Sequence, residues 1–313
     1  KRLFIQNVCH LIHKMLRIFN LISIVIALLW GVKKGHAQTI DTSIIIDSHR
    51  IHFNIFKDSG IPILFESGAG DDATVWDSII KPIAELTNAT IIMYDRAGFG
   101  KSTIDTVSAS NSDNWILDGL KDLEIGLETL GYNKDIILVS HSYGGYLSSL
   151  YANKYPDRVK SIILIDVSHN FHAKTAKKEA KKHAKEVNAL SNSNPGFYFL
   201  ATNYPKTAHY MSTISFPKEI PIIDLVHEIS FMNSKRKSNY WQKCHQDFSN
   251  NHPNSKAIIA KGCGHYIWHD NPCLIIKTIA EAFAELTNEI NKKIIHRKIS
   301  DFTDSENICK KDS

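Results

Sequence analysis

The sequence of 313 residues predicts an α/β fold: a mainly parallel sheet of eight strands, helices on both of its faces, and a helical lid inserted after the sixth strand. Eight short runs rich in β-branched residues recur along the chain, and most of the later ones are separated by stretches long enough for a helix. The runs are almost continuously apolar, which is typical of strands buried on both faces of a parallel sheet.

Composition and charge exclude several classes of protein. With 43% hydrophobic and 22% charged residues, the chain is close to an average globular protein, which argues against extended disorder and a multi-span membrane protein. The formal net charge of +5 comes from the first 37 residues, so the rest of the chain is nearly neutral. We therefore expect a small-molecule partner and no nucleic-acid partner, because nucleic acids require a dense basic face.

Residues 1–37 are interpreted as a secretory signal peptide. They combine basic residues, a short apolar run over 19–31 and small residues before a cleavage site after Ala37. The apolar run is shorter than the roughly 20 residues that span a bilayer. We therefore expect export to the periplasm or the exterior, with membrane contact only through this segment if it stays uncleaved.

The elements follow one another in a regular order after the cleavage site. Strands are predicted at 43–47, 51–56, 61–66, 90–94, 135–140, 161–166, 222–226 and 256–260. Helices are predicted at 74–86, 113–130, 143–155 and 272–291. The three residues between the first two strands predict a hairpin.

The alternation of strands and helices divides the remaining chain into a split core and an insertion. The core is expected at 38–166 and 217–291, the lid at 167–216 and a flexible tail at 292–313. Six lysines at helical spacing over 173–190 are interpreted as the solvated face of a lid helix. The cysteines after the leader show neither a zinc-site spacing nor a disulfide framework, and their pairing is left open.

The candidate nucleophile is Ser142, in the segment Ser140-His-Ser-Tyr-Gly144. This segment joins a predicted strand to a predicted helix that opens at Tyr143. A serine on such a tight turn projects its hydroxyl away from the sheet, and the helix N-terminus behind it stabilises negative charge. The pattern is Gly-x-Ser-x-Gly with Ser140 at the first small position, to which we assign a structural role.

A serine hydroxyl is a poor nucleophile at neutral pH and requires a base. The candidate base is His265, on a glycine-rich loop that follows the last predicted strand and precedes the helix that begins near Pro272. Its position at the end of that strand distinguishes it from the other histidines, of which the chain has 16 in all.

Two residues are candidates for the acid that orients the base. Asp166 ends the strand after the nucleophile helix, and Glu228 follows the next strand. We favour Asp166, because the loop after Glu228 lacks a turn that would present its carboxylate. For the donors to the developing oxyanion, the glycine-rich loop at 66–70 and the turn at Ser142 indicate the backbone N–H groups of Ala69 and Tyr143.

Together these segments resemble the α/β-hydrolase superfamily over roughly Ser43 to Asn288. Two scaffold segments add to the resemblance: the turn Asp95-Arg-Ala-Gly-Phe-Gly-Lys-Ser102 and the stretch Tyr151 to Val159. The form of the first looks like bacterial members of the branch that holds esterases and proline iminopeptidases. The resemblance implies a lid over the site and no metal or organic cofactor.

The sequence thus predicts a serine hydrolase that cleaves an ester or amide through an acyl-enzyme intermediate. A serine instead of an aspartate at the turn argues against epoxide and haloalkane hydrolysis. The alternative is a non-catalytic or very slow small-ligand-binding protein on the same scaffold, which the departure at Ser140 favours. Neither the substrate nor the oligomeric state is predicted.

Overall fold

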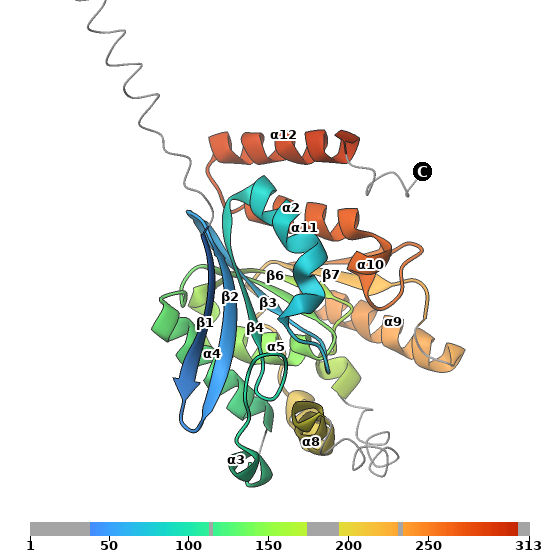
Figure 1. The fold of residues 1–313 in the computed structure, drawn as a ribbon. Coiled ribbons are helices and arrows are strands. Elements are labelled where there is room, and N and C mark those ends of the chain that lie inside the picture. The colour runs from blue at the N-terminus through green and yellow to red at the C-terminus, as the bar shows by residue number, and fades with distance from the viewer. Residues whose placement is uncertain (1–37, 113–114, 174–193, 231–233, 306–313) are drawn as a thin grey trace, which may run out of the picture. The chain divides into compact units, whose positions relative to one another are not determined.

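A computed structural model of the protein describes residues 38–112, 115–173, 194–230 and 234–305 (Figure 1). The signal-peptide interpretation of 1–37 and nearly all of the lysine-rich segment lie outside these residues. No described helix has both the length and the apolar character needed to cross a membrane.

The sheet has eight strands in the order β1-β2-β4-β3-β5-β6-β7-β8, and the predicted fold class is confirmed. The strands are β1 (Gln38–Ile46), β2 (His49–Lys57), β3 (Gly60–Glu66), β4 (Ala89–Asp95), β5 (Ile136–His141), β6 (Val159–Ile165), β7 (Ile222–His227) and β8 (Ser255–Ala260). The first two form the predicted hairpin, and β2 is also antiparallel to β4. Every other neighbouring pair is parallel.

The central strands are buried on both faces, which explains why their sequences are almost continuously apolar. In β4, Ile92 belongs to one hydrophobic cluster and its neighbours Ile91 and Met93 belong to another. The same alternation holds along β5, where Leu138 and Val139 enter different clusters. Because successive side chains of a strand point to opposite faces, each strand contributes to two cores.

The two clusters correspond to two layers of helices (Figure 1). The layer on one face contains α4 (Trp115–Leu130), α5 (Gly144–Lys154) and α8 (Pro195–Met211), and the other contains α2 (Asp77–Thr87), α11 (Pro272–Ala284) and α12 (Glu289–Ser305). Shorter elements are η1 (Ala73–Trp76), α3 (Thr106–Ser110), η2 (Pro156–Arg158) and α10 (Ile267–Asp270).

The structure differs from the sequence-based expectation at three helices. The helix predicted over 272–291 ends at Ala284, and α12 follows it. The expectation of a flexible tail from 292 is wrong as far as Ser305, because Ile295 and Ile299 are buried in the second cluster and keep the segment helical. Finally, α9 (Lys235–Asn251) was not predicted. α8 lies within the segment predicted as a lid, and the lid role stays a prediction.

Candidate active site

Ser142 lies on a tight turn between β5 and α5, in a backbone conformation that a residue with a side chain rarely adopts. Its φ is +52°. The strained turn is held by the neighbouring strand: the N–H of Ser142 donates to the carbonyl of Ile165 at 3.3 Å, and its carbonyl accepts from the N–H of Ser168 at 2.8 Å. The end of β6 therefore fixes the orientation of the candidate nucleophile.

Two glycines after Ser142 are required by close packing. A Cβ at Gly144 would lie 2.6 Å from the carbonyl oxygen of Glu66, and one at Gly145 would lie 2.5 Å from the Cβ of Val167. The start of α5 thus packs directly on the ends of β3 and β6. Ser140, at the first small position of the motif, is fully buried, and its hydroxyl is 2.5 Å from that of Ser148 on α5.

The structure brings Ser142, His265 and Asp166 together. The hydroxyl of Ser142 lies 3.0 Å from Nε2 of His265, and Nδ1 of His265 lies 2.5 Å from Oδ2 of Asp166. His265 stands on the loop between β8 and α10, as the sequence predicts for the base. One imidazole therefore connects the serine to the carboxylate through its two nitrogens.

Asp166 is completely buried and accepts hydrogen bonds from other groups besides His265. Nδ1 of His227 lies 2.7 Å from Oδ2, and Nε1–H of Trp241 donates to Oδ1 at 2.9 Å. Burial alone would raise the pKa of Asp166, but the hydrogen bonds from His227 and His265 hold it well below its usual range. The carboxylate is therefore ionised at neutral pH.

Glu228, the alternative acid, is placed elsewhere. Its carboxylate accepts from the N–H of Gly262 at 2.8 Å and lies 3.8 Å from the ammonium of Lys261. The side chain is 45% exposed. Glu228 thus braces the loop that leads to His265, while Asp166 is the carboxylate that contacts the imidazole.

His227 and Trp241 were not predicted as site residues. His227 is the last residue of β7, and its sequence neighbourhood carries no motif. Trp241 lies on α9, whose mostly polar sequence does not indicate a buried helix. Only the parallel order of β6 and β7, which places their carboxyl ends side by side, could have pointed to His227.

The loop at 66–70, which contains Ala69, lies against the turn that carries Ser142. A Cβ at Gly68 would lie 2.7 Å from Nδ1 of His141. The guanidinium of buried Arg96 donates to the carbonyls of Ser67 and Gly68. Because C=O and N–H of one trans peptide point in opposite directions, this contact turns the N–H of Ala69 away from Arg96. Tyr143, the other predicted donor, directly precedes α5.

His141 contacts His265, the candidate base, through a hydrogen bond and through its ring. Its Nε2–H donates to the carbonyl of His265 at 3.1 Å, and the two rings lie 4.5 Å apart between their centres. Burial lowers the pKa of His141 to about 4, so the ring is neutral at pH 7. The residue adjacent to Ser142 in the chain therefore also positions the backbone of His265.

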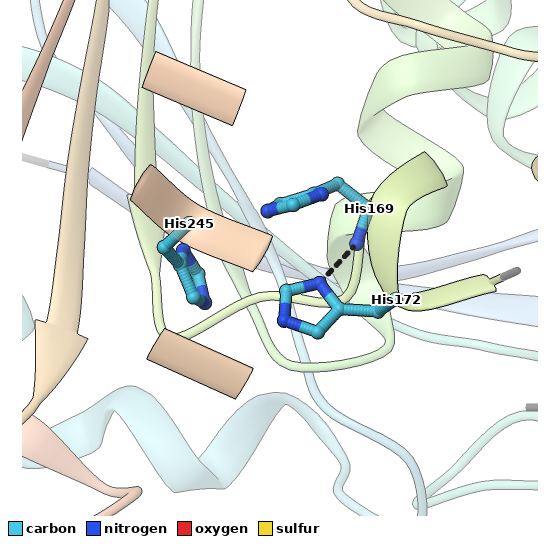
Figure 2. A group of neighbouring side chains, drawn as sticks. All are labelled: His169, His172 and His245. Carbon is cyan, nitrogen blue, oxygen red and sulfur yellow. Dashed lines mark hydrogen bonds between the residues drawn. The ribbon is translucent and has the colours of Figure 1, made fainter. Parts of the chain in front are cut away.

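Two groups in the described part of the chain have side chains suited to holding a metal ion. One consists of Asp166, His227 and His265, in which both imidazole rings contact the carboxylate as described above. The other is His169, His172 and His245, drawn in Figure 2. Its members come from the start of the helical turn after β6 and from α9, and the sequence spacing did not predict this group.

Comparison with known proteins relates the chain to one family. A family model described as "alpha/beta hydrolase fold" matches residues 61–198. The Abhydrolase domain-containing protein abhd-5.2 of Caenorhabditis elegans is 34% identical over 109 residues, which cover 34% of this chain and 23% of that protein. A (lyso)-N-acylphosphatidylethanolamine lipase of Bos taurus is 33% identical over 110 residues, which cover 34% of this chain and 30% of the lipase.

The likeness to solved structures extends over more of the chain. A Vigna radiata epoxide hydrolase mutant superimposes with a TM-score of 0.59 at 15% identity, covering 79% of this chain and 99% of that one. At this identity the likeness shows the fold. The matched segment spans about a quarter to a third of the two sequence relatives named above.

Proposed function

We propose that this chain is a member of the α/β-hydrolase superfamily and a serine hydrolase that cleaves an ester or amide bond through an acyl-enzyme intermediate. One observation carries the proposal: Nε2 of His265 lies 3.0 Å from Oγ of Ser142 while Nδ1 lies 2.5 Å from buried Asp166. This is the spatial arrangement of a nucleophile, a base and an orienting acid.

In the first half-reaction, Oγ of Ser142 attacks the substrate carbonyl carbon and Nε2 of His265 takes the hydroxyl proton. The carbonyl electron pair moves onto the oxygen. When the intermediate collapses, the bond to the leaving group breaks and His265 returns the proton to that group. Asp166 stays ionised, because its hydrogen bonds hold its pKa low, and it stabilises the imidazolium.

In the second half-reaction, His265 takes a proton from water, and the hydroxide attacks the acyl carbon. Collapse of this intermediate breaks the bond to Oγ, and the proton on Nε2 returns to Ser142. The products are a carboxylic acid and the free serine, so no oxidant, metal or organic cofactor enters the balance.

The oxyanion formed in both steps is assigned to the backbone N–H groups of Ala69 and Tyr143. Tyr143 directly follows the nucleophile at the N-terminal end of α5, where the helix dipole favours negative charge. The contact between Arg96 and the carbonyl of Gly68 sets the orientation of the peptide that carries the N–H of Ala69. Both N–H groups belong to backbone that the fold holds in place without substrate.

The alternative of a non-catalytic binding protein rests on Ser140, which replaces the first glycine of the motif. The hydroxyl of Ser140 is buried and contacts the hydroxyl of Ser148. The contact between Ser142 and His265 is intact beside it. This favours a working nucleophile over a decayed one.

Labelling with a fluorophosphonate probe tests the proposal, because the probe reacts with an activated serine. We expect one label per wild-type chain, located on Ser142, and no label on Ser142→Ala. Ser140→Ala is the matched control and should label as the wild type does. A folded wild-type protein that stays unlabelled would favour the binding-protein alternative.

We also propose that residues 1–37 direct export. The support is the basic, apolar and small-residue order of this segment. Mass spectrometry of the protein secreted from a bacterial host should find Gln38 at the amino terminus. A mature chain that retains Arg17 contradicts cleavage at this point.

A further inference from the structure

Three histidines outside the catalytic contacts gather in the interior beside Asp166. His169 and His172 lie three residues apart on the helical turn after β6, and His245 lies on α9 (Figure 2). One ring nitrogen from each lies within 4.8 Å of the others. His169 and His245 are each 1% exposed and His172 is 5% exposed. The cluster is therefore shielded from bulk water.

Two of the rings have a nitrogen without a hydrogen-bond partner among the described residues: Nε2 of His169 and Nε2 of His245. A buried polar atom left without a partner costs free energy, and native structures rarely retain two of them side by side. A metal ion bound by both nitrogens would remove this cost.

Two of the three histidines donate through their other ring nitrogen, as metal-binding histidines do, whereas Nδ1 of His169 accepts from the N–H of Phe171 at 3.4 Å. Nδ1–H of His245 donates to a carboxylate oxygen of Asp224 at 2.8 Å, which leaves Nε2 as the nitrogen that a metal ion could bind. Nε2–H of His172 donates to the carbonyl of Trp241 at 3.2 Å, which leaves the lone pair on Nδ1. Outer hydrogen bonds of this kind fix the ring and its tautomer in metal sites.

The spacing of the nitrogens is compatible with one metal ion. Zinc binds imidazole nitrogen at about 2.0–2.1 Å, so ligands at tetrahedral positions lie roughly 3.3 Å apart. Nδ1 of His172 accepts a hydrogen bond from the backbone N–H of His169 at 3.3 Å, which metal binding at this nitrogen would replace. The ring nitrogens lie within 4.8 Å of one another, so they would approach by at most about 1.5 Å to reach this separation.

The charges around the cluster also suit a dication. Asp224 and Asp166 are both completely buried, and Nε2 of His245 lies 3.9 Å from Oδ1 of Asp166. Neutral imidazole ligands add no charge, so two nearby carboxylates balance the two positive charges of the ion. A bound cation would therefore lower the free-energy cost of keeping these two buried carboxylates ionised.

We propose that His169, His172 and His245 bind one divalent transition-metal ion of the zinc type, with a fourth position left for water or another donor. The ion would tie the segment that follows Asp166 to α9. Because Trp241 on α9 donates to Asp166, this tie supports the position of the acid without entering the reaction. The proposed role is structural.

Metal titration of tag-free protein tests this proposal. Co²⁺ added to metal-stripped wild-type protein should bind at one equivalent per chain with the visible ligand-field absorption of a tetrahedral nitrogen site. One equivalent of Zn²⁺ should abolish that absorption and raise the melting temperature. His169→Gln and His172→Gln should each weaken Co²⁺ binding by at least about tenfold, since losing one of three ligands removes a large share of the binding free energy.

His209→Gln is the matched control, because His209 is exposed on α8 and lies outside the cluster. It should bind Co²⁺ as the wild type does. Folded wild-type protein that takes up no stoichiometric Co²⁺ or Zn²⁺ overturns the proposal, and so does equal binding by wild type and both cluster variants. The wild-type titration decides the question even where a variant fails to fold.

Discussion

Ser142 is hydrogen-bonded through its backbone to the segment that contains Asp166: its N–H donates to the carbonyl of Ile165, and its carbonyl accepts from the N–H of Ser168. Both Ser142 and Asp166 adopt left-handed backbone conformations, with φ values of +52° and +50°. The candidate nucleophile and the candidate acid are thus held by the same pair of adjacent parallel strand ends. Only the base comes from a distant part of the chain.

Ser142→Ala should lower kcat/KM for a short p-nitrophenyl ester by about 10⁴-fold or more, because the covalent step has no other nucleophile. The reaction is followed by the release of p-nitrophenol. Ser140→Ala should stay within about tenfold of the wild type, since its hydroxyl faces Ser148. Equal activity of Ser142→Ala and wild type contradicts the assigned nucleophile.

Substitution of the two candidate acids separates their roles. Asp166→Asn should reduce kcat by about 10³–10⁴-fold, because an amide cannot stabilise the imidazolium of His265. Glu228→Gln keeps an oxygen that accepts from Gly262 and should change kcat by less than about threefold. Steady-state kinetics on one ester measures both changes in kcat. A larger loss of kcat in Glu228→Gln than in Asp166→Asn would assign the acid to Glu228.

His227 is predicted to position Asp166. His227→Phe removes the Nδ1 donor and should lower kcat by roughly tenfold while KM changes little, since the loss is one hydrogen bond to a charged group. His227→Asn restores a donor near the same place and should recover much of the activity. If the residue served packing alone, the phenylalanine variant would be the more active of the two.

His141 should make stability depend on pH. In the unfolded chain it takes up a proton near pH 6.5, whereas burial delays protonation in the folded state to about pH 4. The unfolded state therefore binds more protons in this window, and stability falls as the pH is lowered from 6.5 to 4 by as much as about 3 kcal/mol from this residue.

Urea unfolding of wild type and His141→Gln at a series of pH values measures this contribution as a difference. Other buried histidines also titrate, so the comparison between the two proteins isolates His141. The variant should lose less stability than the wild type between pH 6.5 and 4. Parallel curves for the two proteins would show that His141 is protonated at the same pH in both states.

Arg96 is expected to hold the loop at 66–70 through its contacts with Glu66 and the carbonyls of Ser67 and Gly68. Arg96→Met leaves the carboxylate of Glu66 buried without its cation and should destabilise the protein by about 3–5 kcal/mol. Adding Glu66→Gln should recover part of this loss. Thermal unfolding measures the stability of the single and the double variant. A double variant that is less stable than Arg96→Met alone would contradict the ion-pair explanation.

The strands could be predicted because their signal is local. β-branched runs such as the one in β5 reveal a buried strand without knowledge of its neighbours. α9 could not be predicted, because its 17 residues are mostly polar and bury only a few side chains, among them Cys244 and Phe248. Its burial depends on contacts with β7 and β8 that no local pattern reports.

The residues of the candidate site also divide into those with a local sequence signal and those without one. Ser142 and His265 stand in recognisable turns after strands, so their meeting could be predicted from strand order. The choice between Asp166 and Glu228 needed side-chain directions at two neighbouring strand ends. His227 and the cluster at His169, His172 and His245 depend on residues from different elements meeting in space, which spacing along the chain does not encode.

In the described part of the segment 167–216, two aromatic side chains of α8 lie beside residues of the candidate site. Phe197 on α8 lies against the glycine-rich loop at Gly70, and Tyr204 faces Tyr143. The carbonyl of Ser142 accepts from the N–H of Ser168 at the start of this segment, while α8 makes no such backbone contact with Ser142. We therefore expect that exchanging α8 for a helix of different side chains, with Ser168 kept, would change which molecules reach Ser142 and leave the positions of Ser142, Asp166 and His265 unaltered.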